Sequence, residues 1–213
     1  MDTGLAGKVA IVTGATANIG RAIALDLARE GAIIVAGGRD AEAGGRLVAA
    51  AAPGAAHFVA ADMLDPASPA RIRDAALAYG PVSILVNNVG GNVAAGFFAD
   101  SDPAQWMADI DLNLGTTLRM THAVLPGMIA AKAGAIINIG STAGIVGDYM
   151  LPVYSAAKAA VHGFTKVLAK EVGPHGGRGN CVAPYGTVSS DPAAFSAGSR
   201  FRTGFFRTAF AGA

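Results

Sequence analysis

Two residues that could exchange a proton lie in the segment YSAAK, where Tyr154 and Lys158 stand four positions apart. On a helix this spacing places both side chains on the same face. An unperturbed tyrosine has a pKa of about 10 and is a poor base at neutral pH, but a cation one turn away favours the phenolate. Ser141, upstream of the pair, could hydrogen-bond a carbonyl or hydroxyl oxygen. Together the three residues predict acid–base chemistry on a substrate oxygen. Considered singly, Tyr154 could be a half-buried helix start, Lys158 a solvated residue and Ser141 a turn residue.

A glycine-rich turn, TGATANIG, spans residues 13–20 and would join a strand to a helix. In dinucleotide-binding units such a turn brings the backbone close to the pyrophosphate and points the first N–H groups of the helix at it. Gly14, Ile19 and Gly20 fit this arrangement, and Asn18 stands where a middle glycine is expected. Asparagine tolerates positive φ better than most residues, but it adds bulk beside the cofactor. The turn alone therefore leaves cofactor binding open.

The residues after the second expected strand bear on the choice of cofactor. An acidic side chain there accepts hydrogen bonds from the adenosine ribose, whereas an arginine favours the 2′-phosphate of NADP. Arg39 follows Gly38 at this position, so the sequence favours NADP, with a solvated turn residue as the alternative. Asp40 is either a helix cap or a ribose ligand, which keeps NAD open. Asp62, after the third expected strand, either contacts the adenine or caps the next segment.

The elements that must position these residues alternate between short β-branched segments and longer alanine-rich ones. We predict strands at residues 8–14, 32–38, 57–62, 82–88 and 135–141. We predict helices at residues 21–31, 40–54, 66–80, 103–132 and 154–173, with 103–132 bent or interrupted near Pro126.

Strands that are apolar almost throughout, each followed by a helix, indicate a parallel sheet covered on both faces. The predicted fold is therefore α/β, a single doubly wound Rossmann-type sheet flanked by helices. We expect one dinucleotide-binding domain over residues 1–213, in which residues 187–213 form an atypical C-terminal segment.

Composition excludes several classes of protein. Hydrophobic residues make up 52% and charged residues 15% of the chain, which is typical of a globular protein. The net charge of +1 gives no basic surface for nucleic acid or a membrane. No apolar segment approaches the roughly 18 residues that span a bilayer, and no signal peptide is evident, so we expect a cytoplasmic protein.

Cysteine and histidine do not suggest a disulfide framework or a metal site. The single cysteine, Cys181, fits a reducing compartment and is interpreted as a small buried side chain rather than a nucleophile. The histidines are scattered without ligand spacing and are interpreted as surface or packing residues: His57, His122, His162 and His175.

Ordered motifs along the chain resemble the short-chain dehydrogenase/reductase family, from about residue 8 to residue 191. TGATANIG is similar to the cofactor loop of the family, NNVG (87–90) to its NNAG motif, and LNLG to the segment with its catalytic asparagine. The GS that ends at Ser141 and the segment YSAAK complete a catalytic tetrad in matching order and spacing. NCVAPYGTVSSD (180–191) is similar to the segment that closes over the nicotinamide. Because these motifs occur in the family's order, the resemblance is highly specific.

The resemblance implies a role for each matching residue. Tyr154 would exchange a proton with the substrate oxygen, and Lys158 would favour the phenolate and hold the nicotinamide ribose. Ser141 would orient and polarise the substrate oxygen, and Asn113 would position a water that relays protons to solvent. The implied cofactor contacts are Gly14, Asn18, Ile19, Gly20, Arg39, Asp62, Asn88, Gly90, Tyr154, Lys158, Pro184, Gly186, Val188 and Ser190.

The sequence also departs from the family pattern. Val89 replaces the usual alanine of NNAG, and Tyr185 separates the usual proline–glycine pair. The glycines of GGRGN (176–180) are expected to weaken the strand that begins there. The substrate lid and last strand of the family have no recognisable counterpart after Gly186, so this region is expected to be missing or divergent.

The reaction that the resemblance implies is hydride transfer between a nicotinamide cofactor and a small-molecule secondary alcohol or ketone. A carbonyl reductase or a 3-oxoacyl reductase would carry it out. The alternative is a catalytically impaired relative that binds a dinucleotide as a sensor or structural partner, and turnover of ketones would separate the two. The family also implies a homo-oligomer, either a dimer or a tetramer, formed through helices 103–132 and 154–173.

Overall fold

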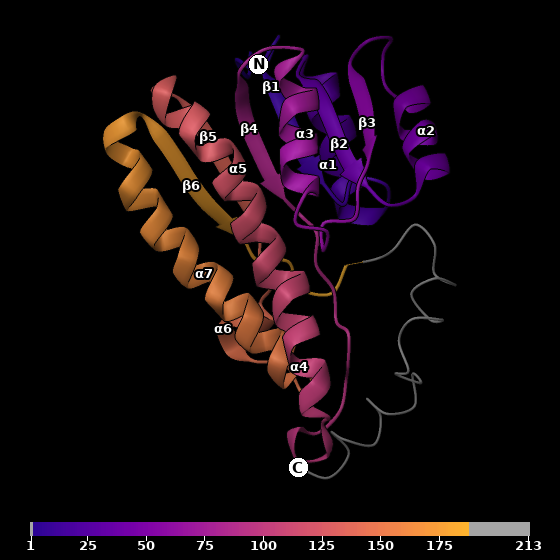
Figure 1. Ribbon diagram of the computed structural model, residues 1–213, viewed down its shortest axis with the longest axis vertical. Coiled ribbons are helices and arrows are strands. Elements are labelled where there is room, and N and C mark those ends of the chain that lie inside the picture. The colour runs from indigo at the N-terminus through magenta and orange to yellow at the C-terminus, as the bar shows by residue number, and fades with distance from the viewer. Residues whose placement is uncertain (1, 188–213) are drawn as a thin grey trace.

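One parallel sheet of six strands organises the protein, whose computed structural model describes residues 2–187. The strand order is β3-β2-β1-β4-β5-β6 (Figure 1). This order reverses between β1 and β4, so the carboxyl ends of the strands open a crevice there. The predicted Rossmann-type α/β fold is confirmed. The strands are β1 Val9–Thr13, β2 Ile33–Gly38, β3 Ala56–Ala60, β4 Val82–Asn87, β5 Gly134–Ile139 and β6 Gly177–Val182.

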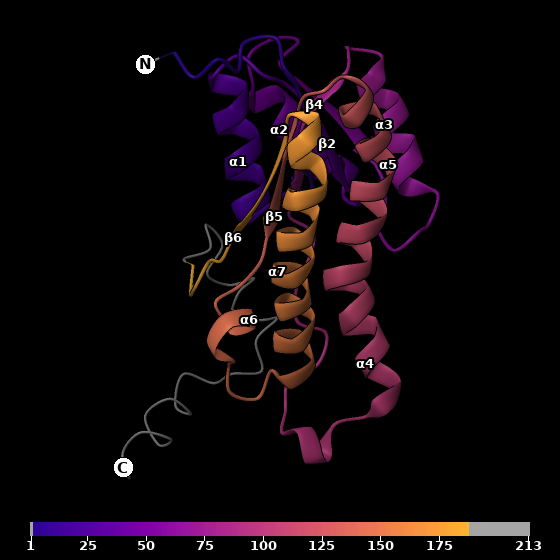
Figure 2. The same cartoon turned by 90° about the vertical axis from the view of Figure 1, so that its left-hand side faces the viewer.

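Helices cover the sheet in two layers that pack on separate apolar cores. One core joins β1 and β2 to Leu25 and Leu47, and the other joins the sheet to Ile72, Met120 and Leu168. The first core belongs to α1 and α2 and the second to α3, α5 and α7, the last two side by side in both views (Figures 1 and 2). The helices are α1 Asn18–Arg29, α2 Ala41–Ala50, α3 Ser68–Leu77, α4 Pro103–Ile110, α5 Thr116–Ala130, α6 Ala143–Val146 and α7 Pro152–Val172.

The long predicted helix is interrupted, but not at Pro126 as expected. Helix α5 continues through Pro126, which has no backbone N–H to donate within the helix. Val124 and Met128 on either side are buried in the core and stabilise this turn. The chain instead leaves α-helical geometry at a π-helical segment, Asp111–Gly115. Such segments are rare and frequently occur at functional sites.

The glycines of the last predicted strand do not prevent it from forming, because they allow a close approach to α7. A Cβ built on Gly177 would lie 2.8 Å from the Cβ of Val172, and one on Gly179 would lie 3.4 Å from the Cα of Ala169. A side chain at Gly177 would push β6 away from the helix, whereas a Cβ at Gly179 would make an ordinary contact with α7. The strand therefore forms with its glycines facing α7, and the expectation that they weaken it stays a prediction.

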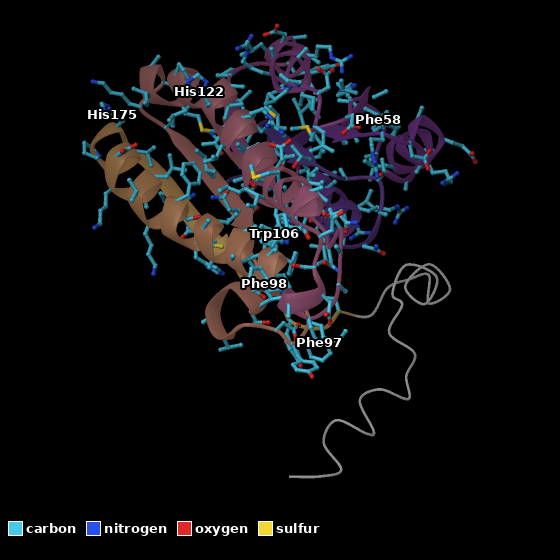
Figure 3. The ribbon with its side chains drawn as sticks, turned by 60° about the horizontal axis from the view of Figure 1, so that its bottom comes forward. Phe58, Phe97, Phe98, Trp106, His122 and His175 are labelled. Atoms are coloured by element: carbon cyan, nitrogen blue, oxygen red, sulfur yellow. The ribbon has the colours of Figure 1, made fainter. Side chains whose placement is uncertain are left out.

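A glycine in the middle of α2 has a similar explanation. Gly44 lies directly over the ring of Phe58 on β3, and a Cβ at this position would overlap with the ring. Phe58 extends from β3 toward α2 (Figure 3). The glycine that weakens the centre of the predicted helix therefore allows it to pack closely on the sheet.

Some sequence predictions lie outside the described residues. Val188 and Ser190, two expected cofactor contacts, belong to this part, as does the C-terminal segment from residue 188 onward. Between residues 2 and 187, none of the helices has the length and apolar character needed to cross a membrane.

Candidate active site

A cleft of about 660 Å³ opens at the carboxyl ends of the strands and brings together most of the predicted site residues. Asn113 and Gly186 do not line it. The structure adds Thr16, Met63, Leu112, Ile139, Tyr185 and Thr187, which no motif singled out as site residues. The predicted residues in its walls are Gly14, Asn18, Ile19, Gly20, Arg39, Asp62, Asn88, Gly90, Ser141, Tyr154, Lys158 and Pro184.

The turn between β1 and α1 has the conformation that a phosphate site requires. Gly14 and Asn18 both have positive φ, +63° and +46°. Asparagine adopts this left-handed conformation more readily than most other non-glycine residues. Helix α1 begins at Asn18, and its N-cap, Ala17, provides no side-chain hydrogen bond to the first turn. This end of the helix therefore offers backbone donors and the positive end of its dipole to the cleft, which fits a pyrophosphate.

Asn88 holds this turn in place from the neighbouring strand. Its side-chain amide donates to the carbonyl oxygens of Thr13 at 3.0 Å and Gly14 at 3.1 Å, while the Thr13 hydroxyl accepts from the Asn88 backbone N–H at 3.0 Å. The sequence predicted an adenosine contact for Asn88. In the structure its amide donors hold the junction of β1 and β4, while Asn88 also lines the cleft, so the cofactor contact stays a prediction.

Gly20 is the residue on which this packing depends most. A Cβ built at Gly20 would overlap with the carbonyl oxygen of Gly14 and the side-chain nitrogen of Asn88. We expect Gly20→Ala to lower the free energy of unfolding by about 1–3 kcal/mol, and to weaken NADPH binding more than about tenfold because the turn must open. Urea unfolding and NADPH fluorescence titration would measure both effects.

Gly163 provides a matched control on the exposed side of α7. A Cβ there meets nothing within 4 Å, so Gly163→Ala should add up to about 1 kcal/mol of stability through helix propensity alone. A Gly20→Ala variant as stable as Gly163→Ala would contradict the steric interpretation.

At the ends of β2 and β3, two carboxylates that the sequence left between a cap and a cofactor contact each accept a backbone hydrogen bond. A Cβ on Gly38 would lie 2.8 Å from the Cγ2 of Thr16, so little room exists for an acidic side chain at the end of β2. Asp40 caps α2, since its Oδ1 accepts from the backbone N–H of Ala43 at 2.9 Å. Asp62 similarly accepts from the N–H of Leu64 at 3.0 Å. Arg39 is exposed in the wall of the cleft and forms no ion pair within residues 2–187.

Helix α7 begins with Pro152 in its first turn and carries the tyrosine and lysine on one face, as predicted. Lys158 is only 4% exposed, and its Nζ donates to the carbonyl oxygen of Ile139 at 2.9 Å. The same Nζ lies 5.9 Å from the centre of the Tyr154 ring. Burial lowers the pKa of Lys158 from 10.5 to about 8, against a smaller opposing effect of Cys181.

Asn113 lies in the π-helical segment directly behind the cleft wall. Its Oδ1 accepts from the Gly91 N–H at 3.0 Å, and its Nδ2 donates to the carbonyl oxygens of Gly91 at 2.8 Å and Asp109 at 2.9 Å. A Cβ on Gly90 would lie 2.8 Å from both Asn113 Oδ1 and Lys158 Nζ. The structure therefore brings the side chains of Asn113 and Lys158 together beside Gly90.

Ser141 follows β5 at the edge of the cleft. Its Oγ accepts from the N–H of Ala143 at 3.1 Å, and its carbonyl oxygen accepts from the N–H of Gly144 at 3.0 Å. The same carbonyl lies 3.1 Å from Nε2 of His162, which therefore carries the proton and donates it. His162 is thus more than the surface or packing residue that its sequence context suggests. Its position four residues after Lys158, on the catalytic face of α7, was the signal that could have identified it.

The remaining candidate groups do not form a second site. Burial raises the pKa of the Cys181 thiol, as suits the small, unreactive side chain expected, although this cysteine is only partly buried. Within residues 2–187, no group of three or more histidine, cysteine, aspartate or glutamate side chains could hold a metal ion.

Comparison with known proteins identifies the family. The family model described as short chain dehydrogenase matches residues 8–196. A 3-oxoacyl-[acyl-carrier-protein] reductase from Pseudomonas aeruginosa is 38% identical over 194 residues, covering 88% of this chain and 76% of the relative. A D-beta-hydroxybutyrate dehydrogenase from Cupriavidus necator is 41% identical over 184 residues, covering 84% of this chain and 70% of the relative.

Solved structures agree with these relatives. A short chain dehydrogenase/reductase family protein superposes with a TM-score of 0.82 at 37% identity, over 89% of this chain and 78% of the other. A short-chain dehydrogenase from Streptomyces avermitilis superposes with a TM-score of 0.81 at 33% identity, over 86% of this chain and 68% of the other. The chain therefore belongs to the short-chain dehydrogenase/reductase family and is an NAD(P)-dependent oxidoreductase.

Proposed function

We propose that this protein reduces the 3-oxo group of a small acyl compound, such as a 3-oxoacyl thioester, with NADPH. The observation that carries the proposal is that Ser141, Tyr154 and Lys158 line the same cleft as the phosphate-binding turn of α1. The two relatives support the substrate class, because both of their names describe a compound with oxygen on the third carbon of an acyl chain.

The side chains of the cleft divide the chemistry between them. NADPH, when bound, supplies the hydride that attacks the carbonyl carbon of the substrate. Tyr154 donates its phenolic proton to the carbonyl oxygen, and Ser141 donates a hydrogen bond that orients and polarises the same oxygen. Lys158 favours the resulting phenolate by its charge and holds the nicotinamide ribose. Asn113, anchored to Gly91, positions the water through which the proton is replaced.

Arg39 accounts for the preference for NADPH over NADH. It is a cation in the cleft wall at the end of β2, where the adjacent carboxylate of Asp40 is already engaged as the cap of α2. A guanidinium group binds a phosphate with charge-assisted hydrogen bonds, whereas it gains little from the ribose hydroxyl of NADH.

We expect Arg39→Ala to raise the KM for NADPH about 10- to 100-fold, the equivalent of one lost charged hydrogen bond, while the KM for NADH stays within about twofold. Initial rates with each cofactor at saturating substrate would measure the two values. Arg46→Ala is the matched control, because Arg46 lies on the exposed surface of α2 and pairs with Glu42. An equal rise in KM for both cofactors would contradict the assignment of Arg39 to the 2′-phosphate.

The proposed substrate class is tested by steady-state kinetics with a panel of carbonyl compounds. We expect the highest kcat/KM with NADPH and 3-oxoacyl thioesters, compared with simple ketones, cyclic ketones and 2-oxo acids. Faster turnover of cyclic ketones than of every 3-oxo compound would contradict the 3-oxoacyl assignment. Tight binding of NADPH with no turnover on the whole panel would instead favour the sensor alternative.

We also propose that the protein is a homo-oligomer formed through the α4–α5 and α7 helices. These helices lie side by side (Figures 1 and 2), and the apolar side chains of Met107, Leu118 and Val167 are exposed on them. Burial of such side chains between copies of the chain would stabilise the assembly. Light scattering of the purified protein would give its mass.

A further inference from the structure

Two side chains of α7 hold the chain at the end of β5. Lys158 donates to the carbonyl oxygen of Ile139 at 2.9 Å, and His162 donates to the carbonyl oxygen of Ser141 at 3.1 Å. Four residues of helix rise about 6 Å, and two residues of strand advance about 6.6 Å. The two spacings match, so both bonds form together and fix the register of the catalytic helix against the strand.

The imidazole of His162 is closely packed against this part of the backbone. A Cβ built on Gly140 would lie 2.9 Å from its Nε2 and 2.7 Å from the Sγ of Cys181, so only glycine leaves the imidazole in place. The N–H of Gly140 in turn donates to the carbonyl oxygen of Val182 at 2.7 Å. The backbone on either side of the Gly140–Ser141 peptide is therefore bonded to β6 through the Gly140 N–H and to α7 through the Ser141 carbonyl.

Ser141 has few other contacts that fix its side chain. Its Oγ accepts one hydrogen bond, from the backbone of Ala143 in the short helix α6. The direction in which the hydroxyl points thus depends on the backbone of residue 141. The carbonyl oxygen of this residue accepts from the N–H of Gly144 in α6 and from His162, which is its side-chain link to α7. Tyr154 and His162 lie on the same helix, so the imidazole links the two groups that must act on one substrate oxygen.

We propose that His162 is a positioning residue, which fixes the hydroxyl of Ser141 relative to that of Tyr154 in the reaction. The inference rests on the proposed function, in which both hydroxyls contact the carbonyl oxygen of the substrate. Reacting groups need to be aligned closely, and a misplacement of about 1 Å can lower a rate about 100-fold. His162 acts through Ser141 and does not itself contact the substrate.

Three variants of His162 distinguish the effect of side-chain length from the effect of losing the hydrogen-bond donor. Glutamine can place an amide N–H close to the position of Nε2, whereas asparagine is one carbon shorter and leucine has no donor. We expect His162→Leu and His162→Asn to lower kcat about 10- to 100-fold, and His162→Gln to stay within about threefold of wild type. The Kd for NADPH, measured by fluorescence, should change less than about twofold in all three.

If His162→Leu fails to fold, the kcat values of His162→Asn and His162→Gln still test the proposal. Both variants carry an amide and differ only in side-chain length. Equal kcat values for these two variants would overturn the proposal. His122→Leu is the control for the loss of an imidazole, since His122 is exposed on α5 at the end of the molecule away from Phe97 and Trp106 (Figure 3). Its kcat should match that of wild type.

A double-mutant cycle with Ser141→Ala tests whether His162 acts through the serine. Once the hydroxyl is absent, its position no longer matters, so His162→Leu should lower kcat by less than about twofold in that background. A loss as large as that in wild type would show a general structural effect and overturn the proposal. Failure of the proposed function would differ, because the wild-type protein would then reduce none of the 3-oxoacyl substrates.

Discussion

Tyr154→Phe is expected to lower kcat by about 10²- to 10⁴-fold, the contribution typical of a positioned general acid. The substitution removes only the phenolic oxygen and leaves the ring, which faces Lys158 Nζ at 5.9 Å from its centre. The carbonyl oxygen of the substrate would then receive its proton only from water. Because the phosphate-binding turn and Arg39 are unaffected, the Kd for NADPH should change less than about threefold.

Single-turnover reduction, followed by loss of NADPH absorbance, would measure this effect separately from product release. Tyr79→Phe is a suitable control, because the Tyr79 hydroxyl bonds Nδ1 of His57 at 3.0 Å and lies at the C-terminal end of α3, outside the cleft. Its kcat should equal that of wild type. A Tyr154→Phe variant that keeps kcat within about threefold would remove Tyr154 from the mechanism and leave the proton source unassigned.

Local patterns in the sequence were sufficient for the parts of the site that depend on local geometry. Tyr154 and Lys158 share a face because the α-helix repeats every 3.6 residues, and the turn at Gly14 and Gly20 lies between a strand and a helix. Parallel strands place their carboxyl ends at one edge of the sheet, which brings residues as distant as Arg39 and Ser141 into one cleft.

Residues whose roles depend on contacts between distant segments could not be assigned in this way. The motif predicts a cofactor contact for Asn88, but it does not show that the amide of Asn88 also donates to Thr13 and Gly14. His162 looked unremarkable, because nothing in the sequence shows that the carbonyl of Ser141 lies beside it. Such bonds form only when the sheet and α7 pack together. A sequence motif identifies the residue but not the group to which it bonds.

The position at which the long helix is interrupted could not be predicted from the sequence either. Proline lowers helix propensity wherever it occurs, but at Pro126 the buried neighbours on α5 outweigh this local effect. The segment around Asn113 contains no proline, and Gly115 is its one poor helix former. There the π-helical turn is stabilised by the bonds of Asn113 to Gly91 and by Arg119, which donates to Asp111 at 2.7 Å. Tertiary contacts decide both positions.

Lys158→Met is expected to abolish most of the activity and yet stabilise the fold at neutral pH. Loss of the ammonium group should lower kcat more than about 100-fold, since the phenolate of Tyr154 loses its neighbouring cation. Burial lowers the pKa of Lys158 from 10.5 to about 8, which reflects the unfavourable burial of a charge. At about 1.4 kcal/mol per pKa unit this effect exceeds the bond to Ile139, so the variant should be about 1–2 kcal/mol more stable.

The pH dependence of this difference follows from the direction of the shift. Between the folded pKa of about 8 and the unfolded value of 10.5, the unfolded chain holds a proton on Lys158 that the folded protein has released. The free energy of unfolding of the wild-type protein therefore rises with pH across that interval. Below pH 8 the burial of the charged ammonium group lowers it by the full amount. The methionine variant lacks the group, so its advantage should be largest at pH 7 and shrink toward pH 10.

Urea unfolding of both proteins at pH 7 and pH 9.5 would measure the change, with Lys166→Met as the control. Lys166 is exposed on α7 and its removal should alter neither stability nor kcat appreciably. A methionine variant less stable than wild type at pH 7, or an advantage that grows with pH, would contradict the account. The expected result would mean that Lys158 is kept for its chemistry at the expense of stability, as is typical of charged groups in active sites.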